Sequence, residues 1–201
     1  MGNLSILRGA LASGQVSAYT TGAITLPSAR TAFETGFNSI ATVTTTSGQT
    51  VVTFSSIPST YKSLQIRGIL RNSAGSGSDN AYMLFNSDTG NNYTTHWISG
   101  DGATATASSV SPWTLQLVGF IPASGATANS FAVTIIDIHD YASTTKYKTV
   151  RYFTGNDRNG SGSMFVGSSS WMNTAAISTL SFNCSDAFEL GTTFALYGIK
   201  G

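Results

Sequence analysis

TVVTFSSIPSTYKSLQIRGILR, residues Thr50–Arg71, is the segment that decides the fold class of this chain. Its second half contains two alternating rows of side chains, one apolar and one mostly polar: Leu64, Ile66, Gly68 and Leu70 against Gln65, Arg67, Ile69 and Arg71. A period of two is that of a β-strand, so we expect the first row to face a core and the second to face water. Pro58 fixes its φ angle and lacks a backbone N–H, so it separates this strand from an earlier one, Thr50–Ser55.

Short strands and polar turns of the same kind fill the rest of the chain, and we predict about ten strands from Phe37 onward. The predicted ranges are 39–45, 50–55, 63–71, 80–85, 93–99, 113–120, 131–138, 146–154, 162–171, 177–184 and 192–199. The first two are expected to form a hairpin about Ser47 and Gly48. The range 131–138 is the most apolar and should lie at the centre of a sheet. Glycine- and serine-rich loops are expected at 72–78, 100–109 and 155–162.

No stretch combines the length and the period of a helix, although residues 185–190 have room for one short helical turn. Many short strands without helical crossovers predict an all-β fold with antiparallel strands in two sheets. The number of strands suits a jelly-roll β-sandwich better than an immunoglobulin-type sandwich. We therefore expect one jelly-roll domain over residues 36–201, preceded by an extended N-terminal arm.

The composition excludes several classes of partner. Charged residues make up 9% of the chain, against roughly 25% in an ordinary soluble protein, while aromatic residues reach 11%. The net charge is +1 without any cluster of Lys and Arg, so we expect no nucleic-acid partner. No run approaches about 20 apolar residues, so we expect no insertion into a membrane. Cys184 is the only cysteine and cannot form a disulfide within the chain.

Residues 1–35 differ from the rest because their apolar residues follow no regular period. Gly2, Gly9 and Gly14 also disfavour a stable helix. A segment that cannot bury a face by itself either frays or becomes ordered on a partner. This segment is more apolar than a solvent-exposed tail normally is, so we predict an assembly arm that uses Leu4, Ile6, Leu7, Leu11, Ile24 and Leu26.

Three motifs resemble, in their order along the chain, a domain found in structural proteins of tailed bacteriophages, including cyanophages. They are FSSIPSTYKSLQIRGILR at 54–71, FNSDTGNNY at 85–93 and TTFALYGIKG at 192–201. The segment GAITLPSAR at 22–30 is similar to a short virion-attachment segment. The resemblance covers about residues 37–201 and implies a virion protein, made in the host cytoplasm, that forms a homotrimer with an outward-facing sandwich domain.

Within that family the resemblance favours a short tail or baseplate fibre protein that touches the host surface. A capsid decoration (cement) protein is the alternative. The expected partners are other virion proteins and a glycan of the host surface. A free-standing carbohydrate-binding sandwich is an alternative from a different functional class. We expect neither an enzyme nor a cofactor, because no nucleophile, phosphate-binding or metal-binding motif is present.

The densest group of titratable residues is Asp137, His139 and Asp140. On a strand Asp137 and His139 share one face, where they could ligate a metal or act as an acid–base pair. Two ligands do not make a site, so the end of a strand is the favoured interpretation. The turn that contains Asp88 has oxygen ligands of the kind calcium prefers. With one carboxylate, however, it is more typical of a turn capped by its own side chains.

Carbohydrate contact is the remaining binding hypothesis, since sugars stack on exposed aromatic rings while amides and carboxylates bond their hydroxyl groups. Aromatic residues in strands are mostly part of a core. Trp171 lies near the expected end of a strand, before a polar segment, and is the best candidate for an exposed ring. The candidate glycan contacts are Tyr93, Trp97, Trp171 and Asn173.

Overall fold

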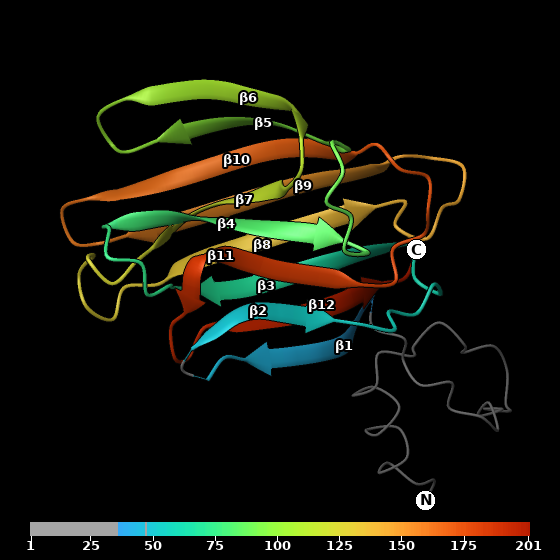
Figure 1. Ribbon diagram of the computed structural model, residues 1–201, viewed down its shortest axis with the longest axis horizontal. Helices are drawn as coiled ribbons and strands as arrows, with labels where there is room; N and C mark the ends of the chain where they lie inside the picture. Colours follow the sequence, from blue (N-terminus) through green and yellow to red (C-terminus); the bar gives the residue numbers. More distant parts are fainter. Residues whose placement is uncertain (1–35, 47) are drawn as a thin grey trace, which may run out of the picture. The chain divides into compact units, whose positions relative to one another are not determined.

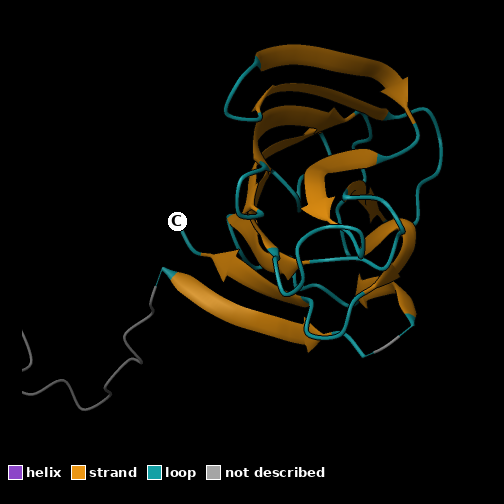
Figure 2. Ribbon diagram, turned by 90° about the vertical axis from the view of Figure 1, so that its left-hand side faces the viewer, coloured by secondary structure: helices purple, strands orange, loops and turns teal. Residues whose placement is uncertain are grey.

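The computed structural model describes residues 36–46 and 48–201. The predicted arm, residues 1–35, lies outside the described residues, so its contacts stay predictions. The described residues form twelve antiparallel strands in two sheets, which confirms the predicted β-sandwich (Figure 1). Strands and loops account for all of this part of the chain, without a helix (Figure 2).

The two sheets differ in width. In spatial order the eight-stranded sheet consists of β1 (Phe37–Thr44), β12 (Thr193–Ile199), β3 (Ser63–Leu70), β8 (Ala132–His139), β9 (Lys148–Asp157), β10 (Gly162–Trp171), β5 (Tyr93–Gly100) and β6 (Ala105–Trp113). The four-stranded sheet consists of β2 (Gln49–Phe54), β11 (Leu180–Phe188), β4 (Ser78–Phe85) and β7 (Gln116–Pro122). As predicted, the apolar segment that forms β8 lies inside its sheet, between β3 and β9.

Eight of the strands have the connectivity of a jelly roll. Strands β1, β2, β3 and β4 alternate between the sheets, giving the orders β1-β12-β3-β8 and β2-β11-β4-β7. Two inserted hairpins, β9–β10 and β5–β6, continue the first sheet beyond β8. The eight-stranded sheet therefore extends past its partner, and in Figure 1 its strands β5, β6 and β10 lie above β4.

Two local predictions are wrong. The hairpin expected about Ser47 and Gly48 does not form, because β1 pairs with β12 and β2 pairs with β11 in the other sheet. The chain crosses between the sheets at this point, as the jelly-roll connectivity requires. The segment 100–109, expected as a loop, contains the turn and the first half of β6. Nearly all side chains of β6 are exposed, so it lacks the apolar alternation that identifies a strand.

Two further segments also differ from the prediction. Residues 185–190 contain the end of β11 instead of a helical turn, because β11 continues to Phe188. The predicted strand 113–120 is divided between the end of β6 and the beginning of β7.

The apolar side chains of β3 face the core, as predicted: Leu64, Ile66 and Leu70 are fully buried. In the same core the ring of Phe194 stacks on Phe182 with centroids 4.5 Å apart. Each fully buried side chain of this size contributes about 1.5–3 kcal/mol. This packing fixes the position of the eight-stranded sheet on the four-stranded one.

Arg71 was expected to face water but is buried, because β3 ends one residue earlier, at Leu70. Its guanidinium donates hydrogen bonds to the carbonyl oxygens of Ala126 at 3.3 Å, Thr127 at 3.0 Å and Ser130 at 2.8 Å. A buried charge needs such partners to offset the loss of hydration. Arg71 thereby holds the connection between β7 and β8.

The inner face of the inserted strands contains hydroxyl groups beside its aromatic rings. The hydroxyl groups of Thr134 in β8 and Thr154 in β9 lie 2.6 Å apart, and Thr154 donates to the carbonyl oxygen of Val118 at 2.7 Å. Farther along, Ser169 donates to Thr95 Oγ1 at 2.8 Å. Buried hydroxyl groups are tolerated in a core when each of them has a hydrogen-bond partner.

Gly167 in β10 provides room for a ring on the same inner face. A Cβ atom added at Gly167 would lie 2.0 Å from the ring of Tyr152, which is the cross-strand partner in β9. The Tyr152 hydroxyl lies 3.2 Å from Thr95 Oγ1, and burial raises the pKa of this phenol. Any side chain at position 167 would therefore displace the tyrosine and the hydroxyl groups bonded to it.

Candidate functional site

Two of the predicted glycan contacts are buried, and for them the prediction is wrong. Trp171 is 1% exposed and Tyr93 is 0% exposed. The Trp171 ring packs against Phe85 with centroids 5.4 Å apart, and the Tyr93 hydroxyl donates to the carbonyl oxygen of Asp88 at 3.0 Å. A ring can stack on a sugar only through an exposed face, which neither residue has. The polar segment after Trp171 suggested exposure, but its first residue, Met172, bonds back to Asn92 through backbone atoms.

The turn that contains Asp88 holds Trp171 in place. Asp88 Oδ2 accepts hydrogen bonds from the indole N–H of Trp171 at 2.7 Å and from Asn92 Nδ2 at 2.8 Å, while Oδ1 accepts from the backbone N–H of Gly90 at 2.8 Å. Burial raises the pKa of the Asp88 carboxyl, but these hydrogen bonds together outweigh it and leave the pKa below its ordinary value. The carboxylate therefore caps its own turn, as predicted.

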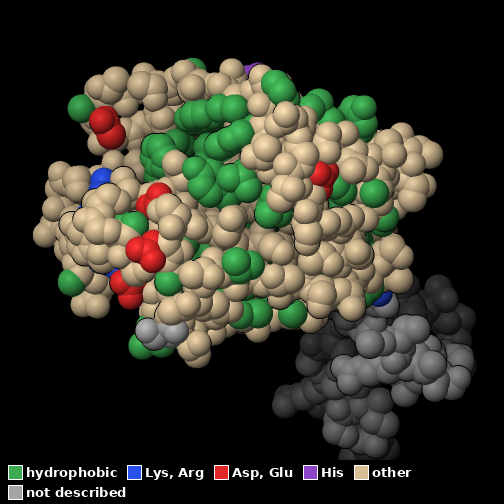
Figure 3. Space-filling view, in the orientation of Figure 1, with side chains coloured by type: hydrophobic (Ala, Val, Ile, Leu, Met, Phe, Trp, Pro, Cys, Tyr) green, Lys and Arg blue, Asp and Glu red, His purple; other side chains and the backbone are tan. Residues whose placement is uncertain are grey.

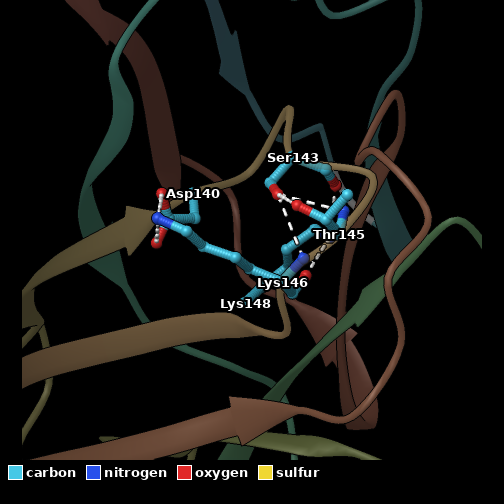
Figure 4. Close-up of polar contacts among 5 residues, drawn as sticks. All are labelled: Asp140, Ser143, Thr145, Lys146 and Lys148. Atoms are coloured by element: carbon cyan, nitrogen blue, oxygen red, sulfur yellow. Dashed lines mark hydrogen bonds and ion pairs between the residues drawn. The ribbon is translucent and has the colours of Figure 1, made fainter.

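Asn173, another predicted glycan contact, lies next to a buried lysine. The fully buried Lys148 donates from Nζ to the carbonyl oxygens of Ser143 at 2.7 Å, Lys146 at 2.8 Å and Thr174 at 3.0 Å, with that of Asn173 at 3.3 Å. Figure 4 shows the part of this group that belongs to the connection between β8 and β9. Burial lowers the pKa of the Lys148 amine. The lysine joins two loops from inside.

Trp97, the fourth predicted contact, is half-buried and packs against the core. It lies opposite Gly167 near the middle of β10, whereas Asn173 follows the end of that strand, so the structure does not bring Trp97 and Asn173 together. Figure 3 shows hydrophobic side chains gathered where the inserted strands extend past the four-stranded sheet.

The predicted group of Asp137, His139 and Asp140 is divided. Asp137 Oδ2 and His139 Nε2 lie 3.6 Å and 3.4 Å from the same nitrogen of Arg151, Nη2. Asp140 instead pairs with Lys146 at 3.3 Å (Figure 4). Within residues 36–46 and 48–201, no three side chains of His, Cys, Asp or Glu gather in a way that could hold a metal ion. In the same part of the chain there is no helix long and apolar enough to cross a membrane.

The face of the eight-stranded sheet that points away from the four-stranded sheet, called the outer face below, carries a row of exposed apolar side chains. Phe153 in β9 is the cross-strand partner of Ile135 in β8 and of Val166 in β10, and Val166 is the partner of Ile98 in β5. The exposed fractions from β8 to β5 are 38%, 44%, 52% and 63%. Cross-strand partners lie about 4.5–5.5 Å apart, so these four residues, called the apolar row, form one continuous strip.

A second set of apolar residues lies beside the apolar row on the same face. Ile69 in β3 is the partner of Val133 in β8, and Met164 in β10 is joined to Val133 through Gly155 in β9. About half of each of these three side chains is exposed. The apolar area is therefore two residues deep along the strands and crosses from β3 to β5.

On its other side the apolar row borders a polar row. Cross-strand register joins Asp137, Arg151, Ser168 and His96 in β8, β9, β10 and β5. A hollow of about 670 Å³ lies over both rows. Asp137 and Arg151 form an ion pair at 3.6 Å, so the polar edge of the hollow is close to neutral. Its occupant should be largely apolar and carry few charges.

A chain of polar contacts connects the hollow to the beginning of the domain. Gln65 donates to Asp137 Oδ1 at 2.8 Å and accepts from Arg67 Nε at 2.8 Å. The Arg67 guanidinium lies over the rings of Phe37 and Tyr197, 5.2 Å and 5.3 Å from their centroids. Phe37 is the first residue of β1, so the chain enters the domain at the edge of the outer face.

The apolar side chains described above form one contiguous exposed patch on the outer face. Such a patch is uncommon on the surface of a monomeric soluble protein, so this face is the candidate functional site. One signal of it was present in the sequence, because the outward row of β8 begins with the apolar residues Val133 and Ile135. In β10 the sequence misleads, since Met164 and Val166 look more suited to a core than Gly167 and Ser169 on the opposite face.

Comparisons of the chain with models of protein families, with curated proteins and with solved structures found no match. The resemblance of the three motifs to phage structural proteins therefore stays a prediction.

Proposed function

We propose that the chain is a structural subunit of a tailed-bacteriophage particle, a short tail or baseplate fibre protein that assembles with copies of itself and with other virion proteins. The observation that carries the assembly role is the apolar row on the outer face. The three sequence motifs support the phage setting. Burying the outer face in a homotrimer leaves the four-stranded sheet and its loops to face outward, toward the host surface.

The energy available on this face is modest. The seven apolar side chains of the outer face are about half exposed, so their complete burial would contribute about 5–10 kcal/mol. Association costs about 4–15 kcal/mol in lost translational and rotational freedom. Contacts between outer faces alone would therefore give weak assembly, and a stable oligomer requires a further contribution from the chain.

Antibody labelling of purified particles tests the phage setting. An antibody raised against residues 36–201 should label the tail tip or baseplate in electron micrographs. Label spread over the capsid would replace the fibre proposal with a decoration protein. If particles of the phage that encodes the chain carry no label, the proposal as a whole is overturned.

Light scattering on a sizing column tests the assembly role. The full chain should elute with three times the mass of 21.0 kDa. Phe153→Ser should shift the mass toward that of one chain, because it places a hydroxyl group in the middle of the apolar row. Thr149→Ala is a matched control, since Thr149 is an exposed outer-face residue of the same strand, outside the apolar row. Equal masses for both variants and the parent would contradict the assembly role of this face.

A further inference from the structure

We infer that the outer face of one copy binds the N-terminal segment Leu4–Leu11 of a neighbouring copy. This inference rests on the proposed function, because it names the partner that covers the apolar row. The occupant is a segment of the same chain that lies outside the described residues.

The composition of the segment matches the surface. NLSILRGAL, residues 3–11, contains four large apolar residues and one charged residue, Arg8. The hollow is lined on one side by the apolar row and on the other by the Asp137–Arg151 ion pair. An apolar segment with a single charge can fill such a hollow without leaving several charges unpaired.

The length of the chain before the domain is sufficient for the segment to reach a neighbouring copy. Strands in a sheet lie about 4.8 Å apart, so a chain that starts at β1 needs roughly 34 Å to cross all eight strands. Leu7 precedes Phe37 by about 30 residues, which span roughly 100 Å when extended. When extended, the chain before Phe37 is therefore long enough to pass its own sheet and contact a neighbouring copy.

Disulfide trapping between two differently labelled copies tests the inference. Cys184 is replaced by Ser in both, which leaves no native cysteine. One copy carries Leu7→Cys and the other carries Val166→Cys, in the apolar row. In the matched control the second copy carries Thr149→Cys, which is also exposed on the outer face but lies outside the apolar row. After mixing and mild oxidation, the cross-linked heterodimer should form at least about five-fold faster with Val166→Cys than with Thr149→Cys.

Three results would overturn the inference. They are equal rates at the two positions, no cross-link at either, and a faster cross-link within one chain when Leu7→Cys and Val166→Cys are combined in a single dilute copy. Circular dichroism of each variant establishes that it is folded before mixing.

A double-mutant comparison separates failure of this inference from failure of the proposed function. Leu7→Ser and Phe153→Ser should each raise the dissociation constant of the oligomer by at least ten-fold, and the double variant should be little weaker than either. If Phe153→Ser breaks the oligomer while Leu7→Ser does not, the assembly role stands and the arm is not the occupant. If neither variant changes the mass, both proposals are wrong.

Discussion

The two faces of strands β8, β9 and β10 each depart in part from the composition that a core or a surface usually has. The inner face carries Thr134, Thr154 and Ser169, all fully or almost fully buried. The outer face carries Ile135, Phe153 and Val166, all exposed. In β10 the inner face combines Gly167 and Ser169 with the buried rings of Phe165 and Trp171, while Met164 and Val166 are exposed.

The difference shows that hydrogen bonding decides which residues a core accepts. Each inner hydroxyl group lies within hydrogen-bond distance of another hydroxyl group or of a carbonyl oxygen. These hydrogen bonds replace the ones that the hydroxyl group would make with water in the unfolded chain. Apolar side chains on the outer face have no such requirement, but their exposure is unfavourable until a partner covers them. The inner hydroxyl groups thus have their partners within one chain, whereas the apolar side chains of the outer face are left about half exposed.

Trp171→Ala should give the largest effect, because it removes the biggest fully buried ring of the inner face. The free energy of unfolding should fall by about 3–5 kcal/mol, as measured by urea denaturation. Trp97→Ala provides the comparison, since Trp97 is only half-buried and should cost clearly less. Equal losses for the two tryptophans would contradict the difference in burial.

Thr154→Val should cost about 1–3 kcal/mol, because it leaves Thr134 and the carbonyl oxygen of Val118 without their partner. Thr134→Val combined with Thr154→Val should cost less than the sum of the two single variants, since the hydroxyl groups are removed as a pair. Thermodynamic cycles from urea denaturation measure this coupling. Additive losses would show that the two hydroxyl groups act independently.

Phe153→Ser tests the opposite face and should cost the dilute monomer less than Thr154→Val does. Its free energy of unfolding should fall by about 1 kcal/mol or less, because 44% of the side chain is already exposed. Urea denaturation at a concentration at which the parent is monomeric provides the measurement. A loss as large as that of Thr154→Val would mean that the apolar row contributes to the fold and not only to assembly.

The smallest expected effect is a pH dependence from Asp88, which supports the inner face through Trp171. The pKa of Asp88 is lower in the folded chain than its ordinary value of 3.8. The folded state therefore binds this proton less readily than the unfolded state. The contribution of Asp88 to stability is complete above pH 3.8 and is lost as the pH falls through the lowered pKa. Asp88→Asn should reduce this acid-side slope in thermal unfolding between about pH 4 and pH 2. An unchanged slope would show that other carboxyl groups cause it.

The sequence predicted the fold class because β3 has a clear alternation and ends at recognisable turns. It could not predict that β1 and β2 pair in different sheets, since pairing depends on contacts with β12 and β11 near the far end of the chain. Strand β6 was missed because its side chains are exposed on both faces.

The candidate site was harder to predict than the fold. The burial of Trp171 could not be predicted from its neighbours in the sequence, because its indole N–H is bonded to Asp88 in a turn far away along the chain. The apolar row consists of single residues from four strands, and only the cross-strand register brings them together. No local pattern in the sequence contains that register.

The inserted hairpins β9–β10 and β5–β6 contribute to both faces of the eight-stranded sheet. Three residues of the apolar row, Phe153, Val166 and Ile98, belong to these hairpins, whereas the jelly-roll strands contribute only Ile135. The inner faces of the same hairpins carry Tyr93 and Trp171 of the core, so exchanging a whole hairpin would alter the exposed surface and the core together. An engineer who wishes to change the apolar row would therefore substitute single outer-face residues and keep the hairpins in place.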